Sequence, residues 1–139
     1  MVDPDQIGRN LPALFAAVMV AVLFLQSALD KALDWKGNLG WLTEHFSKTF
    51  MGRFVPPLLG TILIMELAAG VLATVGILYF LAAASTMIIF CSAVVAAAAL
   101  LSLFFGQRIA KDYPGAAVLV PYFILVVLLM FLTNPYSSR

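Results

Sequence analysis

The chain has 139 residues, of which 63% are hydrophobic and 11% are charged, and its mean hydropathy is +1.04. Soluble domains carry about 25% charged residues, so this composition excludes an ordinary soluble protein and predicts a single small membrane domain over residues 1–139. The net charge of +1 gives no basic surface for nucleic acid, and one cysteine excludes an intramolecular disulfide.

The first predicted transmembrane helix covers about residues 11–29. At about 1.5 Å per residue, this run crosses a hydrocarbon core of about 30 Å. Pro12 fits the first helical turn, where its missing N–H does no harm. A signal peptide is the alternative, but Arg9 is offset by Asp3 and Asp5, and the apolar run is long for that role.

The segment of about residues 36–55 has a different character. Four apolar residues recur at intervals of four, as expected for one face of a helix: Leu42, Phe46, Phe50 and Phe54. Trp35 and Trp41 are typical of a membrane interface. We therefore predict an amphipathic helix in the interface between the first and second spans; the alternative is a loop that caps the bundle.

Residues 60–106 are nearly uninterrupted apolar sequence, about twice the length of one span, so this segment must fold back. We expect the break near residues 76–82, where Gly76 can end a helix. The second and third spans are then about residues 57–76 and 83–105, antiparallel because their connection is short.

The fourth span is predicted at about residues 115–133, after the turn sequence Tyr113-Pro114-Gly115. The expected fold is therefore an all-α membrane protein, an antiparallel bundle of four transmembrane helices with an interfacial helix between the first two. Pairs of small residues four apart, such as Ala69 and Ala73, allow its helices to approach closely in lipid or to meet a partner protein.

Basic residues predict the orientation. They are concentrated in the first and third connections, at Lys31, Lys36, Lys48, Arg53, Arg108 and Lys111. Because basic connections stay in the cytoplasm, both termini are expected outside it. We expect the chain in the inner (plasma) membrane of a bacterium or archaeon.

Glu66 is the most informative residue, because it is the single charge in a predicted transmembrane helix. An unpaired carboxylate in hydrocarbon is costly, so such residues usually face the bundle interior. Ser92 and Tyr122 fall at comparable depth, and a protonated Glu66 could donate a hydrogen bond to either. Glu66 is then either a proton-handling or ligand-anchoring acid, or a structural link between helices.

A second polar group ends the first span. Gln26, Asp30 and Asp34 are spaced by four residues and share a helical face. Lys31 could pair with either aspartate or extend to the head groups. The group is either the polar mouth of a cavity leading toward Glu66 or, as we favour, a helix end meeting water.

The third connection carries Arg108 and Lys111, which could bind a lipid head group or serve as a positive-inside anchor. His45 is the only histidine, which excludes bis-histidine haem within one chain. No His, Cys or carboxylate cluster has the spacing of a metal site, and Cys91 is interpreted as a small apolar filler. We expect no cofactor bound by this chain alone.

Three segments resemble the DoxX/DoxD-like membrane proteins. Leu25-Gln26-Ser27-Ala28-Leu29-Asp30-Lys31-Ala32 resembles the end of that family's first helix, and Glu66-Leu67-Ala68-Ala69-Gly70-Val71-Leu72 its acidic second-helix motif. Lys111-Asp112-Tyr113-Pro114-Gly115-Ala116 resembles its third connection. The resemblance covers most of the chain and implies the same four-helix layout.

The resemblance implies a role in membrane redox chemistry, because DoxD-like relatives are linked to thiosulfate:quinone oxidoreduction. Our leading hypothesis is a non-catalytic accessory subunit of a larger membrane redox or oxidant-handling complex. The alternative is a quinone-binding component, with Glu66 at the ligand or proton site and Tyr122, Gln26 and Ser92 as polar contacts. A carrier or channel is a weaker alternative that would require a homo-oligomer.

Overall fold

The computed structural model describes residues 2–136, and every regular element in that range is helical. The elements are α1 (Pro4–Arg9), α2 (Leu11–Leu33), α3 (Trp35–His45), the 3-10 helix η1 (Gly52–Phe54), α4 (Val55–Ala83), α5 (Met87–Ile109) and α6 (Tyr113–Thr133). Within the described range, α2, α4, α5 and α6 are long and apolar enough to cross a membrane. The prediction of an all-α bundle of four membrane helices is confirmed.

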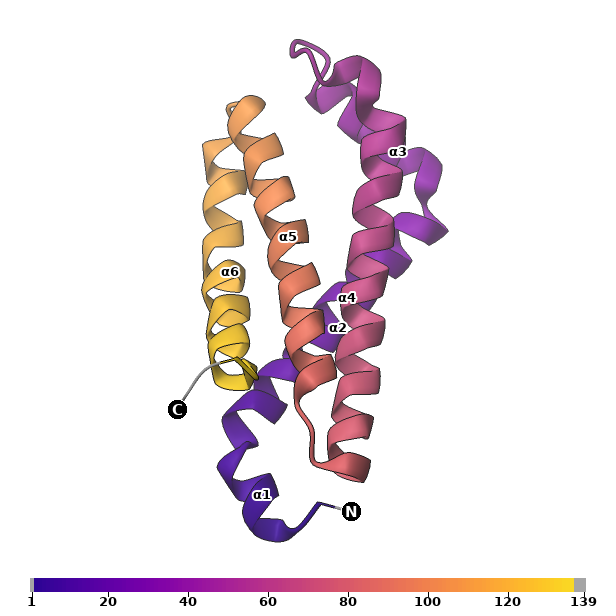
Figure 1. Cartoon of the computed structure of the whole chain (residues 1–139). Coiled ribbons are helices and arrows are strands. Elements are labelled where there is room, and N and C mark those ends of the chain that lie inside the picture. The colour runs from indigo at the N-terminus through magenta and orange to yellow at the C-terminus, as the bar shows by residue number, and fades with distance from the viewer. Residues whose placement is uncertain (1, 137–139) are drawn as a thin grey trace.

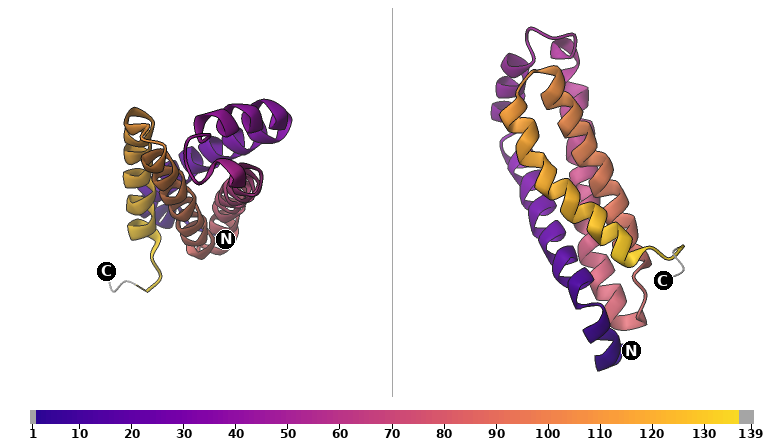
Figure 2. Two further views of the ribbon diagram at one scale, coloured as in Figure 1. Left: turned by 90° about the horizontal axis from the view of Figure 1, so that it is seen from above. Right: turned by 90° about the vertical axis from the view of Figure 1, so that its left-hand side faces the viewer.

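The long helices form an antiparallel array in chain order (Figure 1). α2 packs along α4, α4 along α5 and α5 along α6, while α2 meets α6 over a shorter stretch. Seen from above, α5 and α6 form one arm of a V, and α3 and α4 form the other (Figure 2). α3 packs on α2, α4 and η1, but its backbone does not closely approach α5.

Small residues fill the centre of the bundle and allow the helices to lie close together. Ala17, Ala69, Ala73, Ala93 and Ala96 are fully buried. In lipid, where apolar surface alone does not drive association, such close contact supplies the packing energy. The small-residue pair Ala69 and Ala73 therefore serves the bundle itself.

The predicted break near residues 76–82 is wrong, because α4 continues to Ala83 and the chain turns at residues 84–86. A Cβ at Gly76 would lie 2.8 Å from the backbone nitrogen of Ile89, so the glycine serves a close crossing of α4 and α5. The helix instead ends at Ala84, a left-handed residue with φ 58° whose N–H donates to the Phe80 carbonyl at 2.7 Å.

The predicted helix between the first two spans is present as α3 (Trp35–His45), but it is shorter than the predicted segment of about residues 36–55. α3 ends at His45, and a series of turns leads to η1. Phe46 lines a pocket, whereas Phe50 is 70% exposed and Phe54 is 49% exposed, so the three do not share one face. Their spacing fits a helical period, but the chain forms turns here instead, with hydrogen bonds from both the Thr49 N–H and the Thr49 hydroxyl to the Phe46 carbonyl.

The remaining boundaries shift by a few residues. α2 continues four residues beyond the predicted end, so Asp30 and Lys31 lie inside the helix. α5 runs from Met87 to Ile109, four residues later at each end than expected. α6 agrees with the prediction at its end and begins at Tyr113, where the Asp112 carboxylate accepts a hydrogen bond from the Gly115 N–H at 3.0 Å.

Candidate functional site

Glu66 and Lys31 form an ion pair inside the bundle. Glu66 lies on α4 and is 1% exposed, and Lys31 lies in the last turn of α2. The Lys31 Nζ is 3.1 Å from each carboxylate oxygen of Glu66. It also donates to the Ser27 Oγ, one turn earlier on α2, at 2.9 Å. Three acceptors thus match the three N–H groups of the ammonium.

The depth of the pair follows from the length of α4. Glu66 is about 17 Å along the axis from the start of the helix at Val55, and about 26 Å from its end at Ala83. It therefore lies in the half of α4 nearer to α3, where α2 ends. This offset places the last turn of α2 level with Glu66, so a lysine near a helix end can reach the carboxylate.

A buried ion pair is costly to assemble. Desolvating two charges opposes their attraction, and the balance is favourable only when good geometry and further hydrogen bonds support it. The Ser27 hydroxyl supplies one such bond to Lys31. Ionisable groups kept within membrane helices usually mark a functional site, and here both charges come from long apolar helices.

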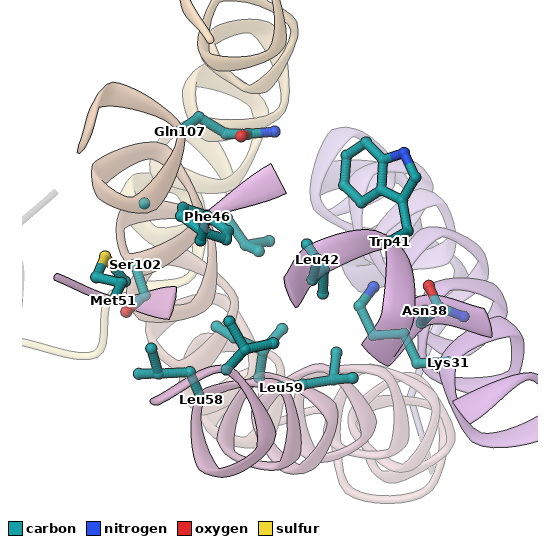
Figure 3. Close-up of a pocket in the computed structure, with 14 residues that line it drawn as sticks. Lys31, Asn38, Trp41, Leu42, Phe46, Met51, Leu58, Leu59, Ser102 and Gln107 are labelled. Atoms are coloured by element: carbon teal, nitrogen blue, oxygen red, sulfur yellow. The ribbon is translucent and has the colours of Figure 1, made fainter. Parts of the chain in front are cut away.

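A cavity of about 280 Å³ adjoins the ion pair (Figure 3). Its walls come from α3, the turn after it, the first half of α4 and the end of α5, with Lys31 contributed by α2. Most lining side chains are apolar, and the polar ones are Lys31, Asn38, Trp41, Ser102 and Gln107. An apolar pocket with a few converging polar groups is the usual form of a small-molecule site.

Lys31 connects the ion pair to this cavity. Its side chain is 18% exposed, against 1% for Glu66, and it is the one charged residue in the pocket lining. In Figure 3 it lies on the side of Asn38 and Trp41. A ligand in the pocket would therefore meet the lysine first, with Glu66 behind it.

His45 bridges two walls of the pocket at the end of α3. Its Nε2 lies 2.9 Å from the Gln107 Oε1 and 3.5 Å from the Asp112 Oδ2. The His45 ring stacks on the Trp41 indole with centroids 4.6 Å apart, and meets the Phe46 ring edge-on at 5.1 Å. These contacts join α3 to the α5–α6 turn.

The predicted contacts of Glu66 are not brought together. Ser92 is buried, but its hydroxyl donates to the Ile89 carbonyl at 2.7 Å. Tyr122 is half-buried on α6 against the apolar core, and Gln26 is exposed on α2. The acid finds its partner in Lys31 instead, and the predicted hydrogen bond from Glu66 to Tyr122 or Ser92 is replaced by an ion pair.

The residues predicted to form a polar mouth do not stay together, because α2 ends at Leu33 and Asp34 lies in the turn before α3. Asp30 and Asp34 are exposed, and their backbone carbonyls accept hydrogen bonds from the Asn38 side chain at 3.4 and 2.8 Å. Lys31 pairs with Glu66 instead. Of the predicted group, Lys31 is the one member that lines the pocket. Asn38, which the sequence analysis did not identify, also lines it.

Arg108 lies in the last turn of α5, and Lys111 lies on the exposed connection between α5 and α6. The Arg108 guanidinium lies 4.5 Å from the centroid of the Tyr113 ring, a favourable cation–π geometry. Lys111 is a turn residue with φ 60°. Their roles as head-group ligands stay predictions.

Sequence reasoning missed the position of His45. The residue follows Trp41 by four positions, a spacing that places two side chains on one helical face. That spacing predicts the ring stack, whereas the contact with Gln107, 62 residues away, depends on the fold. The residues that the structure describes contain no group of three His, Cys, Asp or Glu side chains arranged to hold a metal.

No protein-family model, curated protein or solved structure matches the chain. The resemblance to the DoxX/DoxD-like proteins therefore stays a prediction that depends on the three sequence segments alone.

Proposed function

We propose that this membrane protein binds a small, largely apolar ligand in the pocket beside Lys31, with the ammonium as donor to an oxygen of the ligand head group. The observation that supports the proposal is the buried Lys31–Glu66 pair, whose lysine lines an apolar cavity. A ligand oxygen can replace one of the two contacts between the ammonium and the carboxylate, while the other keeps the charges paired.

The charge balance of the pocket favours a neutral head group. The ammonium and the carboxylate cancel each other, so an anionic ligand would leave an uncompensated charge among apolar side chains. A carbonyl oxygen accepts a hydrogen bond without adding charge. A quinone, which the family resemblance also implies, has such a head group and an apolar ring suited to this lining.

Tryptophan fluorescence tests ligand binding directly, because Trp41 lines the pocket. Decylubiquinone, added to the purified Trp35→Phe variant in mild detergent, should quench the Trp41 emission in a saturable manner. Leu59→Phe would place a larger ring in the pocket and should weaken this quenching by about tenfold or more, as expected for loss of about 1.4 kcal/mol of binding energy.

The matched control is Leu101→Phe, which makes the same substitution at a 58% exposed position on α5 outside the pocket. It should leave the quenching curve unchanged. Unsaturable quenching, or equal curves for the two variants, would contradict binding in this pocket.

A second proposal is that the chain is an accessory subunit of a larger membrane redox complex. The outward face of α5 supports it, because Cys91 and Ala98 are small and exposed, and such a face allows another membrane helix to approach closely. Purification of the tagged chain from its native membrane in gentle detergent, followed by mass spectrometry, should recover oxidoreductase subunits in stoichiometric amounts. Recovery of the chain alone would contradict this proposal.

A further inference from the structure

The wall of the pocket formed by α3 is held to α5 by side chains rather than by helix packing. α3 packs on α2, α4 and η1, and its backbone does not closely approach α5. The space between them contains the pocket, which both helices line. Across that space, the His45 Nε2 meets the Gln107 Oε1 at 2.9 Å and the Asp112 Oδ2 at 3.5 Å.

His45 also orders the side chains that line this part of the pocket. Its ring stacks on Trp41 and meets Phe46 edge-on, and its nitrogen contacts Gln107. All three partners are lining residues, although His45 itself is not. A change in the contacts of this imidazole would therefore affect Trp41 on α3, Phe46 in the following turn and Gln107 on α5 together.

Asp112 is fixed in place for this contact. Its Oδ1 accepts the Gly115 N–H and caps α6, which leaves the Oδ2 facing His45. The carboxylate therefore presents a negative charge to the imidazole at the turn between α5 and α6.

We propose that His45 is a pH-sensitive clasp, which holds the α3 wall against the α5–α6 turn when protonated and lets the pocket open when neutral. The proposal goes beyond ligand binding, because it concerns access to Lys31 whatever the ligand is. A protonated imidazole donates from Nε2 and attracts the Asp112 carboxylate. The neutral ring has no charge, and one of its two tautomers lacks the Nε2 proton.

Several charged groups lie near His45 in sequence or on the elements that face it. Glu44 and Lys48 lie near it on its own segment. On the facing side, Arg108 lies in the last turn of α5, and Lys111 precedes Asp112 on the connection to α6. The Arg108 guanidinium is engaged with the Tyr113 ring. Among the described residues, the Asp112 carboxylate is the anionic group within 4.0 Å of a His45 ring nitrogen, so protonation of His45 is expected to strengthen this contact.

Cysteine accessibility tests the clasp without any ligand. Leu59 lines the pocket and is 3% exposed, so Leu59→Cys in a Cys91→Ala background reports access through the pocket. A small uncharged thiol reagent would be applied at about pH 5.5 and at about pH 8. The same reaction in a His45→Gln background corrects for ionisation of the thiol, because glutamine keeps a donor that does not titrate.

At the lower pH, the thiol should react about fivefold more slowly with His45 present than with His45→Gln, as expected from the difference between charge-assisted and neutral hydrogen bonds. At the higher pH the two rates should agree. Asp112→Asn keeps an acceptor for the Gly115 N–H and removes the charge, so it should reduce the pH effect. A ratio that does not change with pH would overturn the proposal.

A second measurement does not depend on the Leu59→Cys variant. In a Trp35→Phe protein, the emission of Trp41 should fall on acidification, because an imidazolium stacked on the indole quenches it. His45→Gln should abolish this pH dependence of the emission. Emission that is independent of pH in the presence of His45 would also overturn the proposal.

Discussion

Lys31 pairs with Glu66 rather than with an aspartate close to it in the sequence. In the sequence, Lys31 stands beside Asp30 and close to Asp34, so local pairing is the obvious expectation. In the fold, α2 extends to Leu33, and α4 is long enough that Glu66 lies level with the last turn of α2. The charged partner is therefore 35 residues away rather than one turn away.

The Lys31–Glu66 pair predicts strongly non-additive mutations. Glu66→Gln should destabilise the protein by about 3–5 kcal/mol, because it leaves the Lys31 ammonium without its counter-charge in an apolar site. The double variant Lys31→Met/Glu66→Leu removes both charges together and should cost much less. Unfolding in mixed micelles by a denaturing detergent measures both, and equal losses of stability for the single and double variants would refute the pairing.

At the scale of elements, glycine positions decide how closely the helices cross. A Cβ at Gly76 would lie 2.8 Å from the backbone nitrogen of Ile89 on α5, and one at Gly70 would lie 2.9 Å from the backbone nitrogen of Leu25 on α2. Backbone atoms cannot move aside as a flexible side chain can. These two glycines therefore hold α4 against its two neighbours.

Gly76→Ala should destabilise the bundle by about 1–3 kcal/mol, the usual cost of overpacking a close contact. Gly60→Ala is the matched control on the same helix. A Cβ there would meet only the Trp35 side chain at 3.8 Å, an ordinary contact, so this variant should be neutral or gain up to about 1 kcal/mol from helix propensity. The same unfolding assay compares them, and a larger loss for Gly60→Ala would contradict the observed crossing.

At the scale of the whole molecule, the two basic connections lie at one end. His45 in the first connection contacts Gln107 and Asp112 near the third, while the α4–α5 turn lies at the opposite end (Figure 1). The fold thus groups the connections that carry most of the lysines and arginines. Because basic connections are retained in the cytoplasm, this end is expected to face it.

Cysteine labelling in intact cells tests that orientation. In a Cys91→Ala background, Thr43→Cys and Lys111→Cys should be protected from a membrane-impermeant maleimide, and Ser85→Cys, at the opposite end, should react. Permeabilisation should expose all three positions. Labelling of Thr43→Cys and Lys111→Cys in intact cells, with Ser85→Cys protected, would reverse the predicted topology.

The sequence by itself determined the helical membrane fold, because hydrocarbon requires backbone hydrogen bonds within each segment and about 20 apolar residues per span. It also identified Glu66 as the unusual residue, since one charge among apolar neighbours is visible without any structure. The predicted fourth span, residues 115–133, agrees closely with α6, because the turn before it carries strong local signals.

Only the tertiary structure decided which groups meet. Gly76 is compatible with a helix end or a close crossing, and the backbone of α5 selects the crossing. The spacing of Phe46, Phe50 and Phe54 is compatible with a helix, and local turns override it. The Lys31–Glu66 pair and the His45 bridge depend on relative heights and rotations of helices distant in sequence, and these are set by packing of whole helix faces rather than by local pattern.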